Sequence, residues 1–326
     1  MVESAHKRHT AQIPEALAGQ RLDQALASLF SQYSRTAIKQ WIENGLVTLN
    51  LAQAGRPSRK VKFGDKIEFV AAFEASMDNR PQPVRFEVVY SDDAVIVVDK
   101  PSGVVVHPGA GNPDRTLVNG LLAVFPELAT LPRAGLIHRI DKDTSGLLVV
   151  GRGSASYQAM VRALSRREIS RLYDAIVNGV LLAGGTIDAA ITRDPRQRTR
   201  MRVADSGRSA VTHFRVKKRF RAHTLIEVQL ETGRTHQIRV HLAYRGHPIT
   251  GDPKYGGRRR LPPSPTAGLA TSISSFSRQA LHARRLEFVH PVSYEKMSFE
   301  APLPDDMSAL IAALERDLTE HANKPS

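Results

Sequence analysis

The chain has 326 residues, of which 41% are hydrophobic and 24% charged, and it contains no cysteine. Disulfides, thiolate nucleophiles and thiolate zinc sites are therefore excluded, which fits a reducing cytoplasm. Lys and Arg total 46 against 32 Asp and Glu, a net charge of +14, and such a positive field favours nucleic acid as the partner. No apolar run approaches the roughly 20 residues of a membrane helix, and residues 1–9 lack the apolar core of a secretory signal.

The first 83 residues contain one small periodic unit between two irregular stretches. Residues 1–17 are polar and predict a loose basic tail, and residues 76–83, with two prolines, predict a linker. Residues 18–75 between them predict a small α+β unit. Its expected elements are helices over 21–30 and 34–44 and strands over 46–50 and 65–70.

This unit resembles the S4 RNA-binding module, in which a helix pair and a hairpin present a basic surface to RNA. The resemblance implies that Arg21, Arg35 and Lys39 bind RNA. The hairpin turn departs from the module, because this chain has Asn50-Leu51 where members of the module usually carry Asn-Gly.

From residue 84 to 326, short strands outnumber helices, which predicts a mixed, mostly antiparallel sheet in an α+β domain. The glycine fingerprint of a dinucleotide-binding fold is absent from the sequence. Residues 257–279, rich in Pro, Ser and Arg, predict a mobile loop. Strands are expected over 84–90, 94–98, 147–150, 172–177, 211–217, 224–230 and 295–299, and helices over 116–125, 154–165, 235–244 and 306–320.

The most informative segment is H-R-I-D-K-D-T-S-G at residues 138–146. A lone aspartate before such a turn is usually a turn or capping residue, so a chemical role for Asp141 needs partners elsewhere. Two segments can supply them: D-K-P-S-G-V-V-V-H-P-G at 99–109, and G-R-T-H-Q-I-R-V-H at 233–241, which runs from a strand end through a glycine turn into a helix.

These segments, in this order, resemble the RluA family of pseudouridine synthases over roughly residues 84–305. R-A-G-L-I-H-R-I-D at 133–141 and G-D-P-K-Y-G-G-R at 251–258 add to the resemblance. It implies an RNA isomerase that detaches uracil from its ribose and rejoins it through carbon, with no cofactor and no metal. The implied substrate is 23S ribosomal RNA of the large ribosomal subunit, at the helix 69 stem-loop.

The resemblance also assigns roles to residues. It makes Asp141 the catalytic nucleophile, and attack on the sugar C1′ and another route are both open. Arg239 becomes its partner, whose guanidinium would hold the carboxylate and lower its pKa. Tyr173 would stack on the base, and Arg139 would fill the space left by the extracted nucleotide. Without the resemblance, Tyr173 would be predicted to pack in the core and Arg239 to lie on a helix surface.

Other polar residues have weaker signals. His138 is a candidate for substrate binding, although a structural hydrogen bond is the commoner role for such a histidine. His236 and His241 are five residues apart, which does not fit a helical zinc pair. Residues 193–221 contain eleven Lys and Arg against two acids, which predicts a surface that contacts phosphates.

Two other functions are compatible with parts of the sequence. A non-catalytic RNA-binding or ribosome-assembly factor would explain the charge but not the joint presence of Asp141, Tyr173 and Arg239. A metal-dependent nuclease using Asp141, Asp143 and nearby histidines would need a larger cluster of carboxylates. For any of the three we expect a monomer with no membrane partner.

Overall fold

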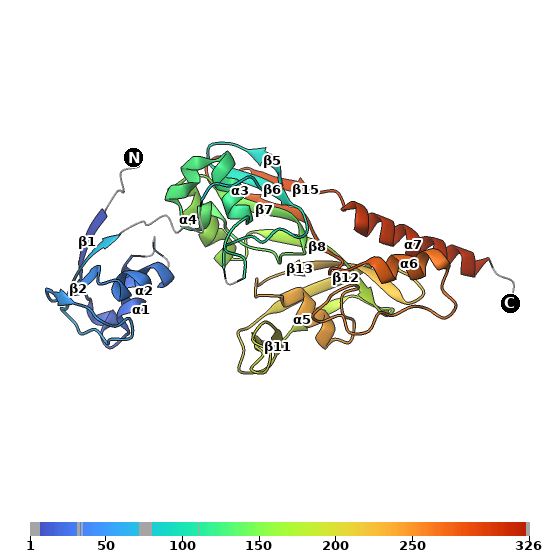
Figure 1. Cartoon of the computed structure of the whole chain (residues 1–326), viewed down its shortest axis with the longest axis horizontal. Coiled ribbons are helices and arrows are strands. Elements are labelled where there is room, and N and C mark those ends of the chain that lie inside the picture. The colour runs from blue at the N-terminus through green and yellow to red at the C-terminus, as the bar shows by residue number, and fades with distance from the viewer. Residues whose placement is uncertain (1–6, 31–32, 34, 72–79, 110, 324–326) are drawn as a thin grey trace. The chain divides into compact units, whose positions relative to one another are not determined.

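The computed structural model describes residues 7–30, 33, 35–71, 80–109 and 111–323 (Figure 1). These residues divide into two compact units, with the boundary between residues 80 and 81. That boundary falls within residues 76–83, the stretch expected to be a linker, of which residues 76–79 lie outside the described residues. No helix in the described part of the chain is long and apolar enough to cross a membrane.

The N-terminal unit is a four-stranded antiparallel sheet, in the order β1-β4-β2-β3, with two helices. Apolar residues of both helices and of the sheet, among them Leu22, Ile38 and Phe69, form its buried core. Its elements are β1 (Lys7–Gln12), the 3-10 turn η1 (Glu15–Leu17), α1 (Leu22–Leu29), α2 (Arg35–Glu43), β2 (Val47–Leu49), β3 (Ala52–Gln53) and β4 (Lys66–Ala71).

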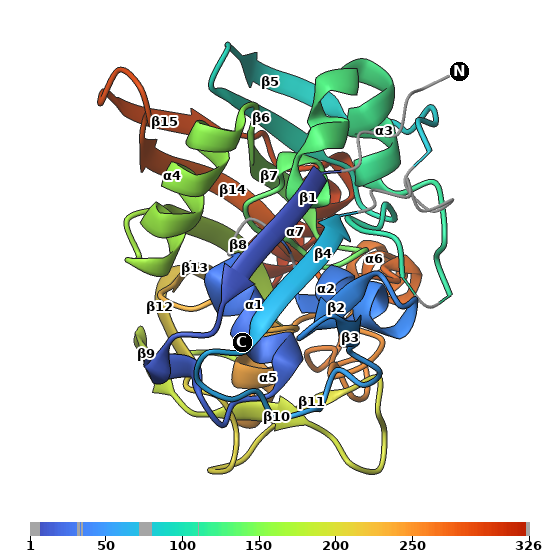
Figure 2. The same ribbon diagram turned by 90° about the vertical axis from the view of Figure 1, so that its left-hand side faces the viewer.

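The expectation of a loose tail over residues 1–17 is wrong for the part that the structure describes. Residues 7–12 form strand β1, which pairs with β4 (Figure 2). His9 stacks on Phe69 with ring centroids 5.0 Å apart, and Ile13 is fully buried. The apolar face of this strand is built largely from a histidine and an alanine, so the polar sequence gave no alternating hydrophobic signal.

The β2–β3 turn has the backbone of an Asn-Gly turn without its glycine. Asn50 and Leu51 have φ values of 52° and 70°, both in the left-handed region that a tight two-residue hairpin turn requires. Asn tolerates this region, but a leucine there is strained. The Leu51 side chain is also 89% exposed, so it gains no packing in return.

The C-terminal unit is built on a nine-stranded sheet in the order β5-β6-β7-β14-β8-β13-β12-β9, with β15 paired to β14. Strand β14 runs parallel to β7 and antiparallel to β8, and the other neighbours are antiparallel. The predicted mixed, mostly antiparallel α+β domain is thus confirmed. Its strands are β5 (Glu87–Ser91), β6 (Val95–Lys100), β7 (Ser145–Gly151), β8 (Ser170–Asn178), β9 (Gly185–Asp188), β12 (Val211–Arg219), β13 (His223–Leu230), β14 (Leu281–Val289) and β15 (Lys296–Glu300), with a separate ribbon of β10 (Ile191–Arg193) and β11 (Met201–Val203).

Helices cover both faces of the sheet (Figures 1 and 2). Side chains alternate along each strand, so Ile96 and Val98 face one buried cluster while Val95 and Val97 face another. The first cluster contains residues of α3, α5, α6 and α7, and the second contains Met160 of α4. The helices are α3 (Leu117–Val124), α4 (Ser154–Ser165), α5 (Gln237–Tyr244), α6 (Ala267–Ser275) and α7 (Asp305–Ala322), with 3-10 turns η3 (Pro126–Thr130) and η4 (Pro132–Gly135).

The structure contains several elements that were not expected from the sequence, including strands β3, β9, β10, β11 and β14 and helix α6. Residues 257–279 are not one loop, because α6 lies within them, with Thr266 as its cap and Leu269 and Ile273 buried. Strand β14 was not expected at all, although it lies at the centre of the sheet. Its Arg284 pairs with Asp174 of the adjacent strand β8 and with Glu227 of β13, one strand further. The positive charge that made this segment look unlike a strand is therefore neutralised across the sheet.

Candidate active site

Asp141 lies in the turn that leads into β7, at the middle of the sheet. The backbone N–H of Thr144 donates to the carbonyl of Asp141 at 3.1 Å and closes this turn. The turn can reach the sheet centre because β14 approaches β7 closely at Gly146. A Cβ there would lie 2.3 Å from the carbonyl oxygen of Ala283, and φ is +114°, so only glycine fits.

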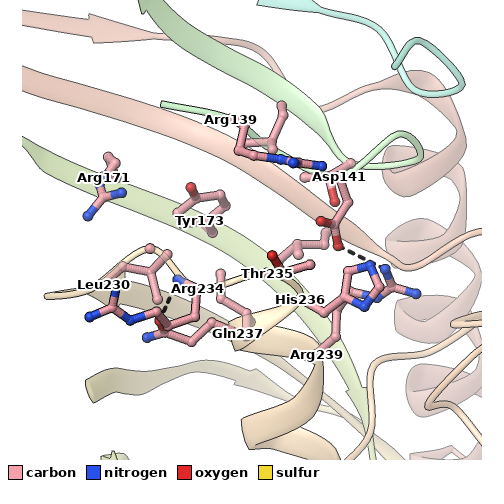
Figure 3. A pocket seen from close by; sticks show the side chains of 15 residues that line it. Arg139, Asp141, Arg171, Tyr173, Leu230, Arg234, Thr235, His236, Gln237 and Arg239 are labelled. Atoms are coloured by element: carbon pink, nitrogen blue, oxygen red, sulfur yellow. Dashed lines mark hydrogen bonds and ion pairs between the residues drawn. The ribbon is translucent and has the colours of Figure 1, made fainter. Parts of the chain in front are cut away.

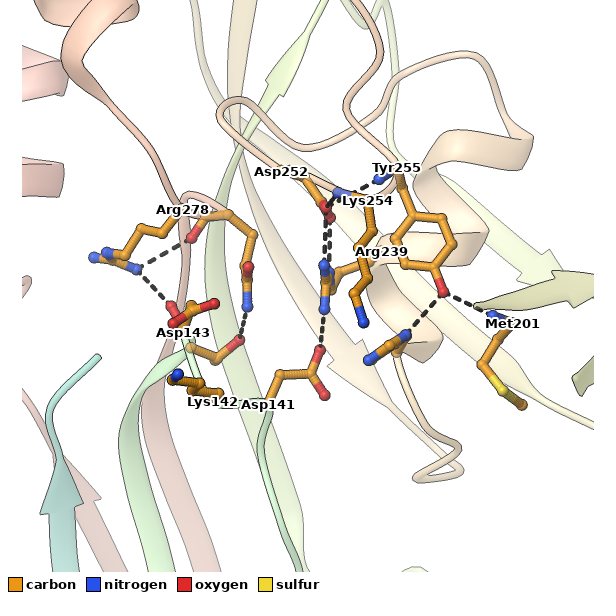
Figure 4. Close-up of polar contacts among 12 residues, drawn as sticks. Asp141, Lys142, Asp143, Met201, Arg239, Asp252, Lys254, Tyr255 and Arg278 are labelled. Carbon is orange, nitrogen blue, oxygen red and sulfur yellow. Dashed lines mark hydrogen bonds and ion pairs between the residues drawn. The ribbon is translucent and has the colours of Figure 1, made fainter. Parts of the chain in front are cut away.

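Buried side chains from other segments hold the backbone of this turn, and Figure 4 shows one of them, Arg278. Lys100 is fully buried and its Nζ donates to the carbonyls of Pro101, Val104 and Lys142 at 2.8–2.9 Å. An ammonium group has three N–H donors, so all are used, and the third ties the residue next to Asp141 in place. Arg278 donates to the Asp143 carbonyl at 3.2 Å. Burial lowers the pKa of Lys100 to about 7, although Asp143 and Asp141 act to raise it.

Arg239, in helix α5, holds two carboxylates at once. Its Nη1 donates to Oδ2 of Asp141 at 2.8 Å, while Nε and Nη2 donate to the two oxygens of Asp252 at 2.7 and 2.9 Å. The side chains of Arg239 and Asp252 are 5% and 0% exposed. Burial alone would lower the pKa of Arg239, but the hydrogen bonds and charges of Asp252 and Asp141 outweigh it and raise that pKa.

Tyr255 packs against the other side of this charged group. Its ring centroid is 5.1 Å from the guanidinium carbon of Arg239, and its hydroxyl is hydrogen-bonded to Nδ1 of His236 at 2.8 Å. The backbone N–H of Met201, in β11, donates to the same hydroxyl at 2.8 Å. Helix α5 begins after His236, which has a left-handed φ of 56°. The basic β10–β11 ribbon is therefore joined directly to the residues around Arg239.

Asp141 and Arg239 open onto a pocket that encloses about 550 Å³ of empty space, part of it open to solvent (Figure 3). Tyr173 of β8 forms one wall and is 4% exposed; burial raises the pKa of its hydroxyl. Four arginines and one acid, Asp141, line the pocket. The lining residues are Arg139, Ile140, Asp141, Thr144, Arg171, Tyr173, Leu230, Gly233, Arg234, Thr235, His236, Gln237, Ile238, Arg239 and Leu281.

The pocket combines a carboxylate, an aromatic wall and an excess of positive charge. Oδ2 of Asp141 is held by Arg239, and Oδ1 has no hydrogen bond within the described part of the chain. That oxygen is available to a bound molecule. Among the same described residues, no group of three or more His, Cys, Asp or Glu is placed to hold a metal ion. The arrangement suits an aromatic, negatively charged ligand such as a nucleotide.

Comparison with known proteins agrees with this chemistry. The RNA pseudouridylate synthase family model matches residues 94–244, and the S4 domain model matches residues 20–67. Ribosomal large subunit pseudouridine synthase D of Xanthomonas campestris is 50% identical to this chain, over 94% of this chain and 92% of its own length. The chain belongs to the RNA pseudouridylate synthase family.

Other members of the family are also similar over most of their length. The protein named ribosomal large subunit pseudouridine synthase D in Escherichia coli strain K12 is 46% identical, over 97% of both chains. The solved structure of human RNA Pseudouridylate Synthase Domain Containing 4 has a TM-score of 0.55 and 25% identity, over 70% of this chain and 93% of its own. The resemblance to the RluA family of pseudouridine synthases, read from the motifs, is confirmed.

The structure brings together four of the residues that the synthase motifs indicated. Asp141, Tyr173, Arg239 and Arg139 all line the pocket, and Figure 3 shows Arg139 and Asp141 on the same side of it. His138 does not line it. Its Nε2 faces the backbone N–H of Val149 in β7 at 3.4 Å, and burial lowers its pKa to about 3. Because neighbouring residues of an extended segment point to opposite faces, His138 packs against the strand while Arg139 reaches the pocket.

The three cations indicated in the N-terminal unit lie on its surface, but each already has an acidic partner. Arg21 and Arg35 both bind Asp23, at 2.9 and 2.7 Å, and the Asp23 side chain is 3% exposed. Lys39 lies 3.5 Å from Glu43, one helical turn away. The side chains of the three cations are still 44–54% exposed, so they can reach a further anion.

Sequence reasoning missed several residues of the site. Asp252 and Lys100 stand inside the motifs G-D-P-K-Y-G-G-R and D-K-P-S-G, and no role was assigned to either. A carboxylate next to glycine and proline is typical of a turn, and an isolated lysine is typical of a surface. The motifs themselves were the available signal. Arg171, two residues before Tyr173 on the same strand face, was also missed.

Proposed function

We propose that this enzyme converts uridine to pseudouridine in 23S ribosomal RNA, with Asp141 as the nucleophile. The observation that carries the proposal is the Arg239–Asp141 ion pair at the edge of a pocket with a tyrosine wall. The names of the relatives, which specify the large ribosomal subunit, support the choice of RNA. We propose the helix 69 stem-loop as the target, and cytoplasm as the place of action.

The reaction needs a nucleotide that has left its base stack, because a stacked uracil cannot present its sugar to a carboxylate. In the pocket, the base would stack on the Tyr173 ring, and Arg139, which is exposed at the pocket edge, would occupy the space left in the RNA. The carboxylate of Asp141 would then face the sugar with Oδ1, while Oδ2 stays on Arg239.

Asp141 displaces the base, so a bond forms between the carboxylate and C1′ while the C1′–N1 bond breaks and its electron pair leaves with uracil. Uracil turns and bonds to C1′ through C5, the carboxylate leaves, and the proton on C5 is lost to solvent while N1 takes up a proton. Covalent catalysis by a carboxylate is an established route at glycosidic centres. No step changes an oxidation state, and every group named belongs to this chain or to the RNA.

Release of tritium from 5-tritiated uridine in unmodified ribosomal RNA tests the proposal. The intact protein should release tritium without added metal, and Asp141→Ala should abolish release while RNA binding persists. Binding without release by the intact protein would favour an RNA-binding factor, and strand cleavage that a chelator stops would favour a nuclease. Mapping of pseudouridine in RNA from cells lacking the gene identifies the target sites.

The proposed RNA contacts of the N-terminal unit need a separate test. Arg21 and Arg35 are held by the buried Asp23 with their guanidinium groups partly exposed, and Lys39 is exposed on α2. Replacing all three by Gln should weaken RNA binding and reduce its salt dependence by about two to three phosphate contacts. Unchanged affinity would contradict their role. A monomer is proposed, to be checked by the mass of the protein in solution.

A further inference from the structure

Arg171 is a buried cation of the pocket that has no ion-pair partner among the residues that the structure describes. Arg171 is 6% exposed, and its Nε is buried and has no hydrogen-bond partner among the described residues. Among the described residues, no carboxylate forms an ion pair with it, whereas Arg239 has two. Removing an unpaired charge from water costs several kcal/mol. A guanidinium kept in this state is therefore expected to meet its anion in a bound molecule.

The position of Arg171 places that anion at one end of the pocket. Arg171 precedes Tyr173 by two residues on β8, so both side chains lie on the same face of the sheet. Figure 3 shows Arg171 on the side of Tyr173 away from Asp141, with Leu230 and Arg234 beside it. Its Nη1 lies close to Gly233, where an added Cβ would be only 3.0 Å away.

This end of the pocket is rich in donors and lacks acids. Arg234 also lines it, and its Nε already donates to the Ser209 carbonyl at 3.1 Å. Burial and the charge of Arg208 lower the pKa of Arg234, as expected for a cation surrounded by other cations. The single acid of the pocket, Asp141, is bound to Arg239 at the other end. An anionic ligand would relieve this excess of positive charge.

We propose that Arg171 and Arg234 form a subsite for a phosphodiester of the RNA next to the target uridine. This inference rests on the proposed function, because it takes the ligand to be RNA. A phosphodiester carries a full negative charge in the bound substrate, whereas the uracil oxygens are neutral there. The planar guanidinium also binds two phosphate oxygens at once. With the base on Tyr173, the RNA strand would leave the pocket over Gly233, which has no side chain to obstruct it.

Neutral methylphosphonate substitutions in a helix 69 stem-loop RNA test the subsite. Each phosphate near the target uridine is replaced in turn, and the dissociation constant and single-turnover tritium release are measured with the wild type and Arg171→Met. In the wild type, one substitution should weaken binding or slow release by at least about 10-fold, the effect of losing a charged hydrogen bond. The same substitution should have no further effect on Arg171→Met, because the partner is already lost.

Two controls separate this role from a structural one. Arg171→Lys keeps the charge and should retain part of the methylphosphonate effect, and Arg162→Met removes an exposed arginine of α4 and should change neither measurement. Free Arg171→Met should melt at the same temperature as the wild type or higher, since it replaces a buried unpaired charge by an apolar chain. A clear loss of stability in free Arg171→Met would show that Arg171 is structural.

A second measurement tests the phosphate subsite even if the protein does not form pseudouridine. Binding of oligouridylate is measured against salt, and the wild type should lose one more counterion than Arg171→Met, a difference in slope of about 0.7 for single strands. That difference would support the subsite even if no tritium is released. Equal slopes, or a methylphosphonate penalty that persists in full in Arg171→Met, would overturn it and would point to contact with the base instead.

Discussion

Asp252 is expected to act on the reaction through Arg239, and Asp252→Asn isolates that effect. The Asp252 carboxylate is fully buried and does not line the pocket. Its Oδ1 also accepts the backbone N–H groups of Lys254 and Tyr255, at 2.8 and 3.0 Å. An asparagine oxygen can keep these turn contacts, but its NH2 group would face the Nε donor of Arg239. The substitution therefore removes the ion pair and leaves the turn.

The cost can be worked from the contacts. Removing one partner of a buried ion pair usually costs about 3–5 kcal/mol, because the other charge stays buried. Arg239 keeps Asp141 at 2.8 Å, so the lower end, about 3 kcal/mol, is expected. Asp252 is fully buried, so solvent does not screen its interaction with Arg239. Arg239 would also lose its fixed position, and a misplacement of about 1 Å near a reacting centre costs on the order of 100-fold in rate.

A double-mutant cycle measures both effects. Far-UV circular dichroism in urea should show the loss of stability in Asp252→Asn, and single-turnover tritium release should fall about 100-fold with little change in RNA affinity. In Arg239→Met, the added Asp252→Asn should change the rate no further. A second 100-fold loss in that background would refute the reasoning, since Asp252 would then act independently of Arg239.

The Asp252–Arg239 ion pair also predicts how the stability of the protein changes with pH. Hydrogen bonds and charge from Arg239 overcome the effect of burial and hold the pKa of Asp252 below its ordinary value. A carboxylate with a depressed pKa contributes stability that is present above its unfolded pKa, about pH 4, and is lost as the pH falls through the folded pKa. The wild type and Asp252→Asn should therefore differ fully at neutral pH and converge well below pH 4.

Three further substitutions have expected outcomes. Tyr173→Phe keeps the stacking ring and should slow single-turnover tritium release by no more than about 100-fold, whereas Asp141→Ala abolishes it; equal losses would contradict the stacking role. Leu51→Gly should stabilise the N-terminal unit by about 1 kcal/mol by relieving a left-handed leucine, and the fluorescence of the single tryptophan, Trp41, reports on this unit in urea. Lys100→Met should leave the carbonyls of Pro101, Val104 and Lys142 without their donor and lower stability by about 2 kcal/mol or more. It should also reduce kcat more than RNA affinity, and an unchanged kcat would show that the Asp141 turn does not depend on Lys100.

Sequence periodicity predicted the elements whose burial is one-sided and whose residues are apolar. Helix α4 was expected over 154–165 and has those bounds. Sequence periodicity failed for elements that contain charged side chains paired with residues far away in the chain. Strand β14 contains Arg284, whose partners Asp174 and Glu227 lie on β8 and β13. No local pattern can show that a charge will be paired by residues 57 or more positions away in the chain.

The site was predictable to the extent that its residues lie in motifs with a known chemical meaning. Asp141 and Arg239 are 98 residues apart, and only the resemblance joined them before the structure did. Asp252 lies in a motif that gave it no role, and Arg171 lies outside the quoted motifs, because the importance of both residues depends on burial and on the presence or absence of a partner. Both are properties of the fold, which sequence spacing alone does not contain.

The proposed reaction explains why Arg239 binds a second carboxylate, Asp252, in addition to Asp141. When Asp141 bonds to C1′, its charge is lost, and Arg239 would become a buried cation without a partner at the moment when the barrier is crossed. Asp252 prevents this, because its two hydrogen bonds to Arg239 at 2.7 and 2.9 Å do not involve the reacting atoms. Arg239 can therefore hold Asp141 in the free enzyme and release its charge during the reaction without a desolvation penalty of its own.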